Sequence, residues 1–425
     1  MVVGVDFGTS TTKVVWQDLS DNHFETFLWN PGILGISGLL LPSSVVIRNN
    51  AIHLAPAEDD TRGDDIRLSS IKMCVLCRSN PSICGCGNPI AKDGIIYIPG
   101  TAKGYPAGVV ACLLLAYVFS QIEARLKRQF PEEDLGLIWN VGCPMDYLDE
   151  IDRKHEWETM VGAAMALRQK VANPASISLL AEVANCLDNF VVPTQEERNY
   201  SVQPEGLAAV KAFLESPHGE SKTYAIVDVG AGTTEVSFFL NGRIMTELGQ
   251  PLRPSYLADS TRPIGGGRID AELANAWNCN VEDARRQKEA GELRFPPIQT
   301  LQTICKQYEH TCCEILRSRK LVAAHNKRFD LFIIGGSGRL PPLQQALCGH
   351  VLPGDFVREN WLQMQPPKAL KDRLALQQIY DLLANACGLA SSISWEYYPP
   401  RAVPPMAGLP TAKKPRPDVD EYYPK

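Results

Sequence analysis

Hydrophobic and polar residues alternate along the chain in blocks that predict strands and helices in turn. Short β-branched runs such as residues 2–5 predict strands, and longer apolar stretches at helical spacing predict helices. Further strands are expected over residues 23–28, 44–54, 94–98 and 137–144. Helices are expected over residues 106–130, 154–171, 204–214, 271–277, 281–290, 299–320 and 382–391, with a strand and connecting helix over 177–190. The pattern predicts a mixed α/β protein.

The first sixteen residues predict a strand, a tight turn and a returning strand. Asp6 ends the first strand, where a carboxylate can hold a water of hydrated Mg²⁺. A Gly-containing turn lets the backbone approach a ligand, and its N–H and hydroxyl groups are donors for phosphate. The candidate phosphate-binding residues are Gly8, Thr9, Ser10, Thr11 and Lys13. Alone, such a hairpin is equally typical of a purely structural turn.

Residues 224–239 repeat this plan. An apolar strand ends at Asp228, a Gly-rich turn follows, and a second strand leads back out. The candidate phosphate-binding residues here are Gly230, Gly232, Thr233 and Thr234. Two such hairpins predict two related halves that close on one polyphosphate and its metal from opposite sides.

A third motif, residues 331–347, combines an apolar strand, a Gly-Gly turn and a helix after two prolines. Its candidate nucleotide-binding residues are Gly335, Gly336, Ser337 and Arg339. The turns match neither the dinucleotide-binding nor the Walker pattern. In this order the three motifs resemble the two phosphate motifs and the adenosine motif of the superfamily of actin, sugar kinases and seventy-kilodalton heat-shock chaperones.

The resemblance covers the chain to about residue 392. It implies an actin-like ATPase fold of the α/β class, with two ribonuclease-H-like domains around a nucleotide cleft. The expected units are a first domain over residues 1–190 with an outer lobe at about 40–104, a hinge insertion over 191–222, and a second domain over 223–392 with an outer lobe at about 268–325.

Two further residues fall at positions where the resemblance implies a catalytic role. Lys72 matches a chaperone lysine that reaches the γ-phosphate, although a solvated surface lysine is the simpler interpretation. Glu182 falls where the family carries an acid toward the metal, although no proline follows it and an ordinary exposed glutamate fits as well. Lys13 matches the actin pattern instead, so the chain mixes two branches.

Residues 263–270 resemble the Gly-Gly-x-x-x-Asp element that begins the second outer lobe. Gly265, Gly266 and Gly267 would present amides to phosphates or ribose. In the family an acid and a lysine on the following helix hold ribose and adenine. Lys288 fits the lysine, but Arg285 replaces the acid, so this helix departs from the ribose-binding pattern.

Four cysteines form a C-x2-C-x6-C-x-C array at Cys74, Cys77, Cys84 and Cys86. Four thiolates can hold one tetrahedral Zn²⁺, which would staple the loop over residues 74–86. Reduced thiols or a redox pair explain the array equally well, and it does not belong to the family pattern.

Composition narrows the class of protein. A net charge of −6 gives no basic surface for nucleic acid. The apolar run at residues 109–119 is short for a membrane span and predicts a buried helix. A first strand starting at residue 2 leaves no room for a signal peptide, and 13 cysteines without one favour reduced thiols in the cytoplasm.

Residues 393–425 are proline-rich and predict disorder. Glu-Tyr-Tyr-Pro occurs twice there, at residues 396–399 and 421–424, and suggests a peptide that docks on a protein partner. A spacer with two chance matches is an equal alternative. The tail is too short for the β-sandwich peptide-binding domain of a full heat-shock chaperone.

From the resemblance we expect a chaperone-like molecular switch that binds ATP and ADP with Mg²⁺, hydrolyses ATP slowly without its partner, and acts on a partner protein. The alternative is an actin-like filament protein of the plasmid-partitioning type. A small-molecule kinase is a weaker third possibility, because no catalytic base for a sugar hydroxyl is evident.

Overall fold

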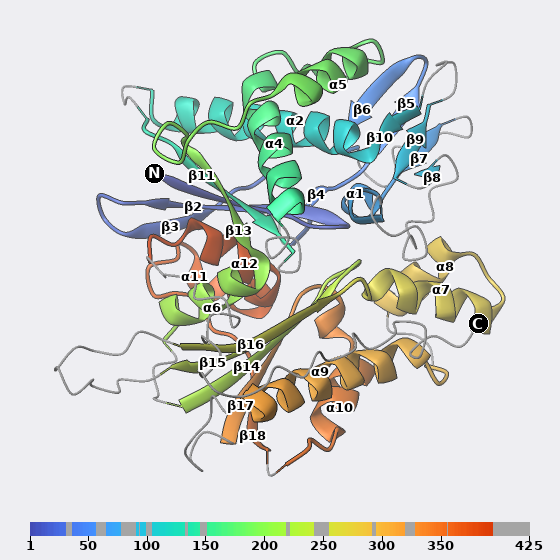
Figure 1. Cartoon of the computed structure of the whole chain (residues 1–425), viewed down its shortest axis with the longest axis vertical. Coiled ribbons are helices and arrows are strands. Elements are labelled where there is room, and N and C mark those ends of the chain that lie inside the picture. Colours follow the sequence, from blue (N-terminus) through green and yellow to red (C-terminus); the bar gives the residue numbers. More distant parts are fainter. Residues whose placement is uncertain are drawn as a thin grey trace, which may run out of the picture.

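The computed structural model shows a mixed α/β protein whose described residues form four β-sheets, which confirms the predicted class. Figure 1 shows two main sheets, one in each half, with two helices between them. The structure describes residues 1–30, 36–56, 65–77, 91–92, 94–98, 104–131, 135–144, 151–217, 222–241, 255–290, 295–318, 328–354 and 356–393.

The first main sheet is built around β1 (Val2–Phe7), which is buried along its whole length. On one side β1 pairs antiparallel with β2 (Thr11–Asp18), and β2 pairs antiparallel with β3 (His23–Thr26). On the other side β1 pairs parallel with β11 (Ile138–Cys143), and β11 pairs parallel with β13 (Tyr200–Pro204). β-branched residues dominate β1, which suits a strand covered on both faces.

The second main sheet has the same plan around β14 (Lys222–Val229). β14 pairs antiparallel with β15 (Thr234–Asn241), which pairs antiparallel with β16 (Ser255–Arg262). On its other side β14 pairs parallel with β17 (Arg328–Ile334), which pairs parallel with β18 (Val357–Leu362). The first main sheet also has a sixth strand, β4 (Leu41–Pro42), which pairs antiparallel with β2. Its other five strands follow in the same order and in the same relative directions as the five strands of the second main sheet.

Helices α2 (Ala107–Gln129), α4 (Ile151–Leu167) and α5 (Leu179–Asn189) pack together in the first half. Among the described residues, α2 has the length and apolar composition of a membrane span. However, 67% of its apolar window is buried inside the protein, where it packs into the core with Trp139 of β11. These contacts are those of a core helix, as the apolar run predicts.

The last helix of each half packs on the sheet of the other half. α6 (Glu205–Glu215) follows β13 of the first sheet and contacts β14 and β15 of the second. α12 (Tyr380–Ala390) comes after the second sheet and contacts β1 and β2 of the first. The two helices cross so closely that a Cβ at Gly388 would lie 1.7 Å from the carbonyl oxygen of Ala208. One apolar core therefore joins the halves.

The predicted hinge insertion over residues 191–222 is wrong in one respect. Residues 200–204 form a strand of the first sheet, and most of α6 is buried. Sequence polarity before Tyr200 concealed a strand whose buried positions alternate with partly exposed ones. This segment therefore connects the halves through the core and is not a surface loop.

Each half carries an outer lobe beside its main sheet (Figure 1). In the first half the lobe has one sheet of β5 (Val45–Arg48), β6 (Ala51–Leu54), β7 (Ile66–Leu68) and β12 (Ala175–Ser176), a second of β8 (Ala91–Lys92), β9 (Ile95–Tyr97) and β10 (Gly104–Pro106), and helix α1 (Ile71–Cys77). In the second half, α7 (Gly266–Trp277) and α8 (Val281–Ala290) share a small apolar core.

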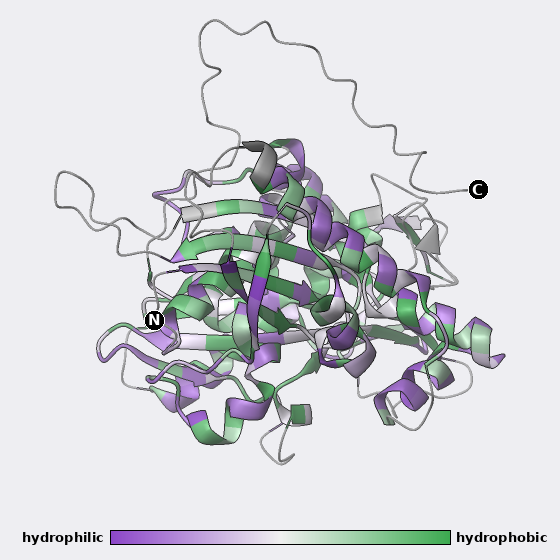
Figure 2. Cartoon of the chain, turned by 90° about the horizontal axis from the view of Figure 1, so that it is seen from below, coloured by the Kyte–Doolittle hydropathy of each residue, from purple (hydrophilic) through white to green (hydrophobic). Residues whose placement is uncertain are grey.

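Figure 2 shows hydrophobic residues concentrated along the main strands and hydrophilic residues along the outer helices. The elements not yet named are η1 (Ile36–Gly38), α9 (Gln299–Ser318), η4 (Ser337–Arg339), α10 (Pro341–Gly349), α11 (Arg373–Leu376) and η5 (Gln377–Ile379). α9 and α10 cover the face of the second sheet that points away from α6.

Candidate functional site

The two predicted acids occupy equivalent positions in the two main sheets. Asp6 lies opposite Lys13 in the β1–β2 hairpin, and Asp228 lies opposite Glu235 in the β14–β15 hairpin. Each acid stands near the end of the central strand, directly before its turn. Because the register is the same in both hairpins, the two carboxylates lie at corresponding ends of the central strands.

The first hairpin closes around a cation. Lys13 Nζ lies 3.0 Å from Asp6 Oδ2 in a largely buried ion pair. The backbone N–H of Gly8 donates to the Asp6 carbonyl at 3.0 Å, which tightens the turn. A Cβ at Gly8 would lie 2.4 Å from the Thr11 carbonyl oxygen, so the turn requires glycine.

The two hairpin turns approach each other across the halves. A Cβ at Gly232 would lie 2.6 Å from Thr9 Oγ1 and 2.4 Å from Met73 Sδ. Gly232 belongs to the second sheet's hairpin, Thr9 to the first hairpin, and Met73 to α1. Asp6 and Asp228 also lie close enough for the charge of Asp6 to raise the pKa of Asp228, although desolvation is the larger cause. The sequence prediction that the two hairpins converge is therefore supported by contacts.

Lys72 lies between these turns. It is 2% exposed, and its Nζ lies 2.5 Å from Glu205 Oε1. Desolvation lowers its pKa most, but the charges of Glu205 and Asp6 together raise that pKa above its ordinary value. Lys72 is thus a buried lysine in an ion pair with Glu205, and the interpretation as a solvated surface lysine is wrong.

Glu205 is the acidic residue that the sequence analysis missed. It begins α6 and is 5% exposed. Desolvation raises its pKa most, Lys72 lowers it, and Asp6 raises it again, with a net shift upward. One signal was available in the sequence. Glu205 directly follows a strand in which buried and partly exposed residues alternate, and Asp6 and Asp228 lie in a similar way at the ends of their strands.

Glu182 lies elsewhere, and its prediction as the metal-supporting acid is not supported. Its exposed side chain accepts a hydrogen bond of 2.6 Å from Lys170. Its helix α5 packs on α2 and α4. Figure 1 shows α5 on the side of the first half away from the second sheet. The acid at the beginning of the helix between the halves is Glu205, because the connecting helix is α6 and not α5.

Two other residues near this group were also missed. Asn385 of α12 donates a hydrogen bond of 2.7 Å to Asp228 Oδ2. Cys143, at the end of β11, is fully buried, and desolvation raises the pKa of its thiol, with Glu205 raising it further. A thiol held protonated beside this cluster is a poor nucleophile.

The three-glycine turn packs directly on the second hairpin. Gly266 donates to the Gly230 carbonyl at 2.9 Å, and Gly267 donates to the Ala231 carbonyl at 2.7 Å. Thr234 Oγ1 donates to the Ile264 carbonyl at 2.6 Å, so this buried hydroxyl holds the turn and is not free for phosphate. A Cβ at Gly265 would lie 2.6 Å from the Gly230 carbonyl oxygen, which explains the glycine.

The adenosine motif meets the same place from the end of β17. Gly335 has a φ of +83°, and a Cβ there would lie 2.2 Å from Asp228 Oδ1. Ser337 Oγ would lie 2.0 Å from a Cβ at Gly266. The structure thus brings together the second hairpin, the three-glycine turn and the adenosine motif.

Arg339 and the other predicted nucleotide-binding residues differ in exposure. Arg339 Nη2 donates to the Gln378 carbonyl at 3.1 Å, and its Nε lies 3.5 Å from Asp381 Oδ2. The guanidinium group of Arg339 is exposed and therefore accessible to the base of a nucleotide. Ser10 and Gly336 are exposed, whereas Thr9 and Thr233 are buried.

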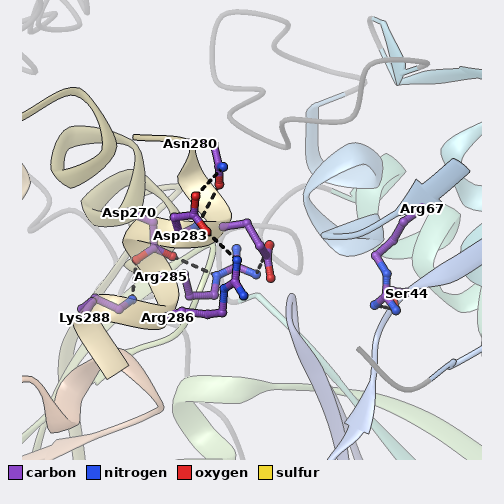
Figure 3. Close-up of polar contacts among 9 residues, drawn as sticks. Ser44, Arg67, Asp270, Asn280, Asp283, Arg285, Arg286 and Lys288 are labelled. Atoms are coloured by element: carbon purple, nitrogen blue, oxygen red, sulfur yellow. Dashed lines mark hydrogen bonds and ion pairs between the residues drawn. The ribbon is translucent and has the colours of Figure 1, made fainter. Parts of the chain in front are cut away.

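Lys288 and Arg285 share one carboxylate in the second outer lobe (Figure 3). Asp270 Oδ1 lies 2.5 Å from Lys288 Nζ, and Asp270 Oδ2 lies 3.2 Å from Arg285 Nε. The pair ties α8 to α7. Figure 3 shows Ser44 and Arg67 of the first outer lobe across from this helix. Lys288 is buried in this arrangement, so the role predicted for it in adenine binding would require it to leave Asp270.

The cysteine array is only partly visible. Cys74 is fully buried in the core of the first half. Cys84 and Cys86 lie outside the described residues, as does the side chain of Cys77. Zinc binding by the array stays a prediction.

The residues around the two turns include more carboxylates than lysines. Asp6, Asp228, Glu205 and Glu235 interact electrostatically with Lys72, and Lys13 pairs with Asp6. Four acids against two lysines favour an additional cation. Among the described residues, no three acid, histidine or cysteine side chains are grouped for direct metal ligation. Carboxylate oxygens suit a hydrated Mg²⁺ held through its waters, so the chemistry of these donors fits that ion.

No protein-family model and no curated protein sequence matches this chain.

Proposed function

We propose that this protein is a Mg²⁺-dependent ATPase of the actin-like superfamily, with two ribonuclease-H-like halves. The observation that carries the proposal is the equal register of Asp6 and Asp228 in two sheets of the same strand order, whose turns meet at Thr9 and Gly232. The sequence resemblance implies a mixed five-stranded sheet in each half, and the first sheet here has β4 in addition to five such strands.

The turns supply the phosphate cradle. The first hairpin offers the amides and hydroxyls around Thr9, and the second offers those around Gly232, with the three-glycine turn behind it. Backbone amides and a lysine at this place can hold a polyphosphate without a basic surface. Adenosine would lie toward Gly335, Ser337 and Arg339.

Each charged residue then has a role. Asp6 and Asp228 would hold waters of the metal, which would neutralise phosphate charge when bound. Lys72 balances charge at the γ-phosphate. Glu205 accepts the proton of the attacking water, because its raised pKa brings it nearer to the neutral range where a general base works best.

The output is a change in how the halves are arranged. α6 and α12 cross between the sheets, and Glu205 at the start of α6 contacts Lys72 of the outer lobe. Occupation of the cleft would alter this contact and bias closure of the lobes. A cytoplasmic partner protein would sense the change, as in a chaperone-like switch.

The test is phosphate release from ATP with and without Mg²⁺. Wild type should turn over ATP only with Mg²⁺, and Glu205→Gln should lower turnover by about a hundredfold or more. Glu182→Gln is the matched control, since it removes an acid at a similar helix position outside the cleft, and it should leave turnover unchanged. Absence of Mg²⁺-dependent ATP binding would overturn the proposal.

Sedimentation with ATP tests the filament alternative in the same samples. A switch stays in the supernatant, whereas an ATP-dependent pellet would favour an actin-like polymer.

A further inference from the structure

Helix α12 is bonded to both halves of the molecule. On the side of the first half, Asn140 Nδ2 donates to the Leu389 carbonyl at 2.7 Å. The backbone of β1 lies directly against it, since a Cβ at Gly4 would lie 2.2 Å from the Ala386 carbonyl oxygen. On the side of the second half, Gly335 donates to the Asp381 carbonyl at 3.2 Å. The helix is thus a rigid link between the strand that carries Asp6 and the turn beside Asp228.

Asn385 lies in the middle of this link. It is 8% exposed, and its Nδ2 donates to Asp228 Oδ2 at 2.7 Å. Its Oδ1 accepts no hydrogen bond from the part of the chain that the structure describes. A buried amide with one donor committed to Asp228 and its oxygen left over can also accept from a water of the metal.

We propose that Asn385 is a positioning residue, which fixes Asp228 at a set separation from Asp6 by tying it to a helix packed on the first sheet. The role in metal binding rests on the proposed ATPase function. The tie itself does not, because it is a contact between two residues of the folded chain.

The electrostatics agree with this geometry. Desolvation raises the pKa of Asp228, and the Asn385 hydrogen bond acts against that rise. An N–H donor stabilises a carboxylate more than a carboxylic acid.

The first experiment needs no nucleotide. Urea unfolding of wild type, Asn385→Ala, Asp228→Asn and the double variant is compared at pH 7. We expect Asn385→Ala to lower the urea midpoint, and to lower it less when Asp228 is replaced by Asn, because the hydrogen bond then has no charged acceptor. Ser391→Ala is the control at the residue directly after the same helix. It removes the hydrogen bonds of the Ser391 hydroxyl to Glu215 and from the Ile393 N–H, and it should not couple to Asp228.

The second experiment measures Mg²⁺-dependent ADP binding by calorimetry. Asn385→Ala should weaken it by about tenfold, as expected for loss of a hydrogen bond to a charged group. Asn385→Asp, which keeps the size but adds a charge, should weaken it further. Ser391→Ala should bind as wild type does.

The outcomes separate the two proposals. An Asn385→Ala effect of the same size with and without Asp228→Asn, or unchanged ADP binding in Asn385→Ala, would overturn the positioning role. A wild type that fails to bind Mg·ADP and Mg·ATP overturns the ATPase proposal instead. In that case the unfolding cycle still decides whether Asn385 is coupled to Asp228.

Discussion

The two hairpins of this protein share a backbone plan and differ in charge. In the first, the residue opposite the acid is Lys13, and the acid forms an ion pair. In the second, the residue opposite the acid is Glu235, and the acid instead receives an amide hydrogen bond from Asn385. Duplicated sheets therefore place their acids alike, while different neighbours decide how each acid is stabilised.

The two halves therefore differ in how they compensate the negative charge of their acids. The first half neutralises its own acid and also supplies Lys72 to Glu205. The second half leaves Asp228 partly exposed, with a raised pKa and with Glu235 rather than a lysine opposite it in the hairpin. An added cation would therefore gain most from the second half's acid.

The largest expected effect comes from breaking the first half's contribution to the cleft. Lys72→Met leaves Glu205 buried without its cation, which should destabilise the protein by about 3 to 5 kcal/mol. Urea denaturation at pH 7 measures this cost. The double variant Lys72→Met/Glu205→Gln should recover much of the loss, and equal instability of both variants would contradict the assignment.

The next effect concerns the place where the hairpins meet. Gly232→Ala drives a methyl group into Met73 Sδ and Thr9 Oγ1, and overpacking of this kind costs about 1 to 3 kcal/mol. Gly230→Ala is the matched control, since its Cβ would lie 3.3 Å from the nearest carbonyl oxygen. Thermal unfolding compares the two. A smaller loss for Gly232→Ala than for Gly230→Ala would show that the turns are not in contact.

Neutralising Asp6 and neutralising Asp228 should change the stability of the protein in opposite directions. Asp6→Asn removes the partner of Lys13 and should lower stability by about 1 kcal/mol at pH 7, whereas Asp228→Asn should raise it by a similar amount. The second sign follows from the raised pKa of Asp228. Stability from that group is present below its unfolded pKa and is lost as pH rises through the folded pKa.

The pH dependence sharpens this prediction. The gain in stability from Asp228→Asn should shrink as the pH falls toward 4, because the carboxylate of wild-type Asp228 takes up a proton as the pH falls. Unfolding curves at several pH values measure it, and stabilisation that is independent of pH would point to another cause.

The smallest effect is expected outside the cleft. Glu182→Gln removes an exposed contact with Lys170, so both the melting temperature and ATP turnover should stay at wild-type values. A loss of turnover in this variant would restore Glu182 as a site residue and weaken the case for Glu205.

Much of the local structure could be predicted from the sequence. The helix expected over residues 281–290 has the bounds of α8, and the apolar run in residues 106–130 lies in α2. Asp6 and Asp228 lie before their turns as expected. Side-chain periodicity and turn residues specify such features, because they depend on neighbours along the chain.

Only the tertiary structure decided which acid reaches the cleft and which helix joins the halves. Lys72 and Glu205 are 133 residues apart in sequence, and Asn385 and Asp228 are 157 apart. Periodicity shows that a helix has a buried face, but it does not show which distant segment covers that face. The pairing of α6 and α12 with each other's sheets therefore appears only when the chain is folded, and it places Glu205 and Asn385 at the site.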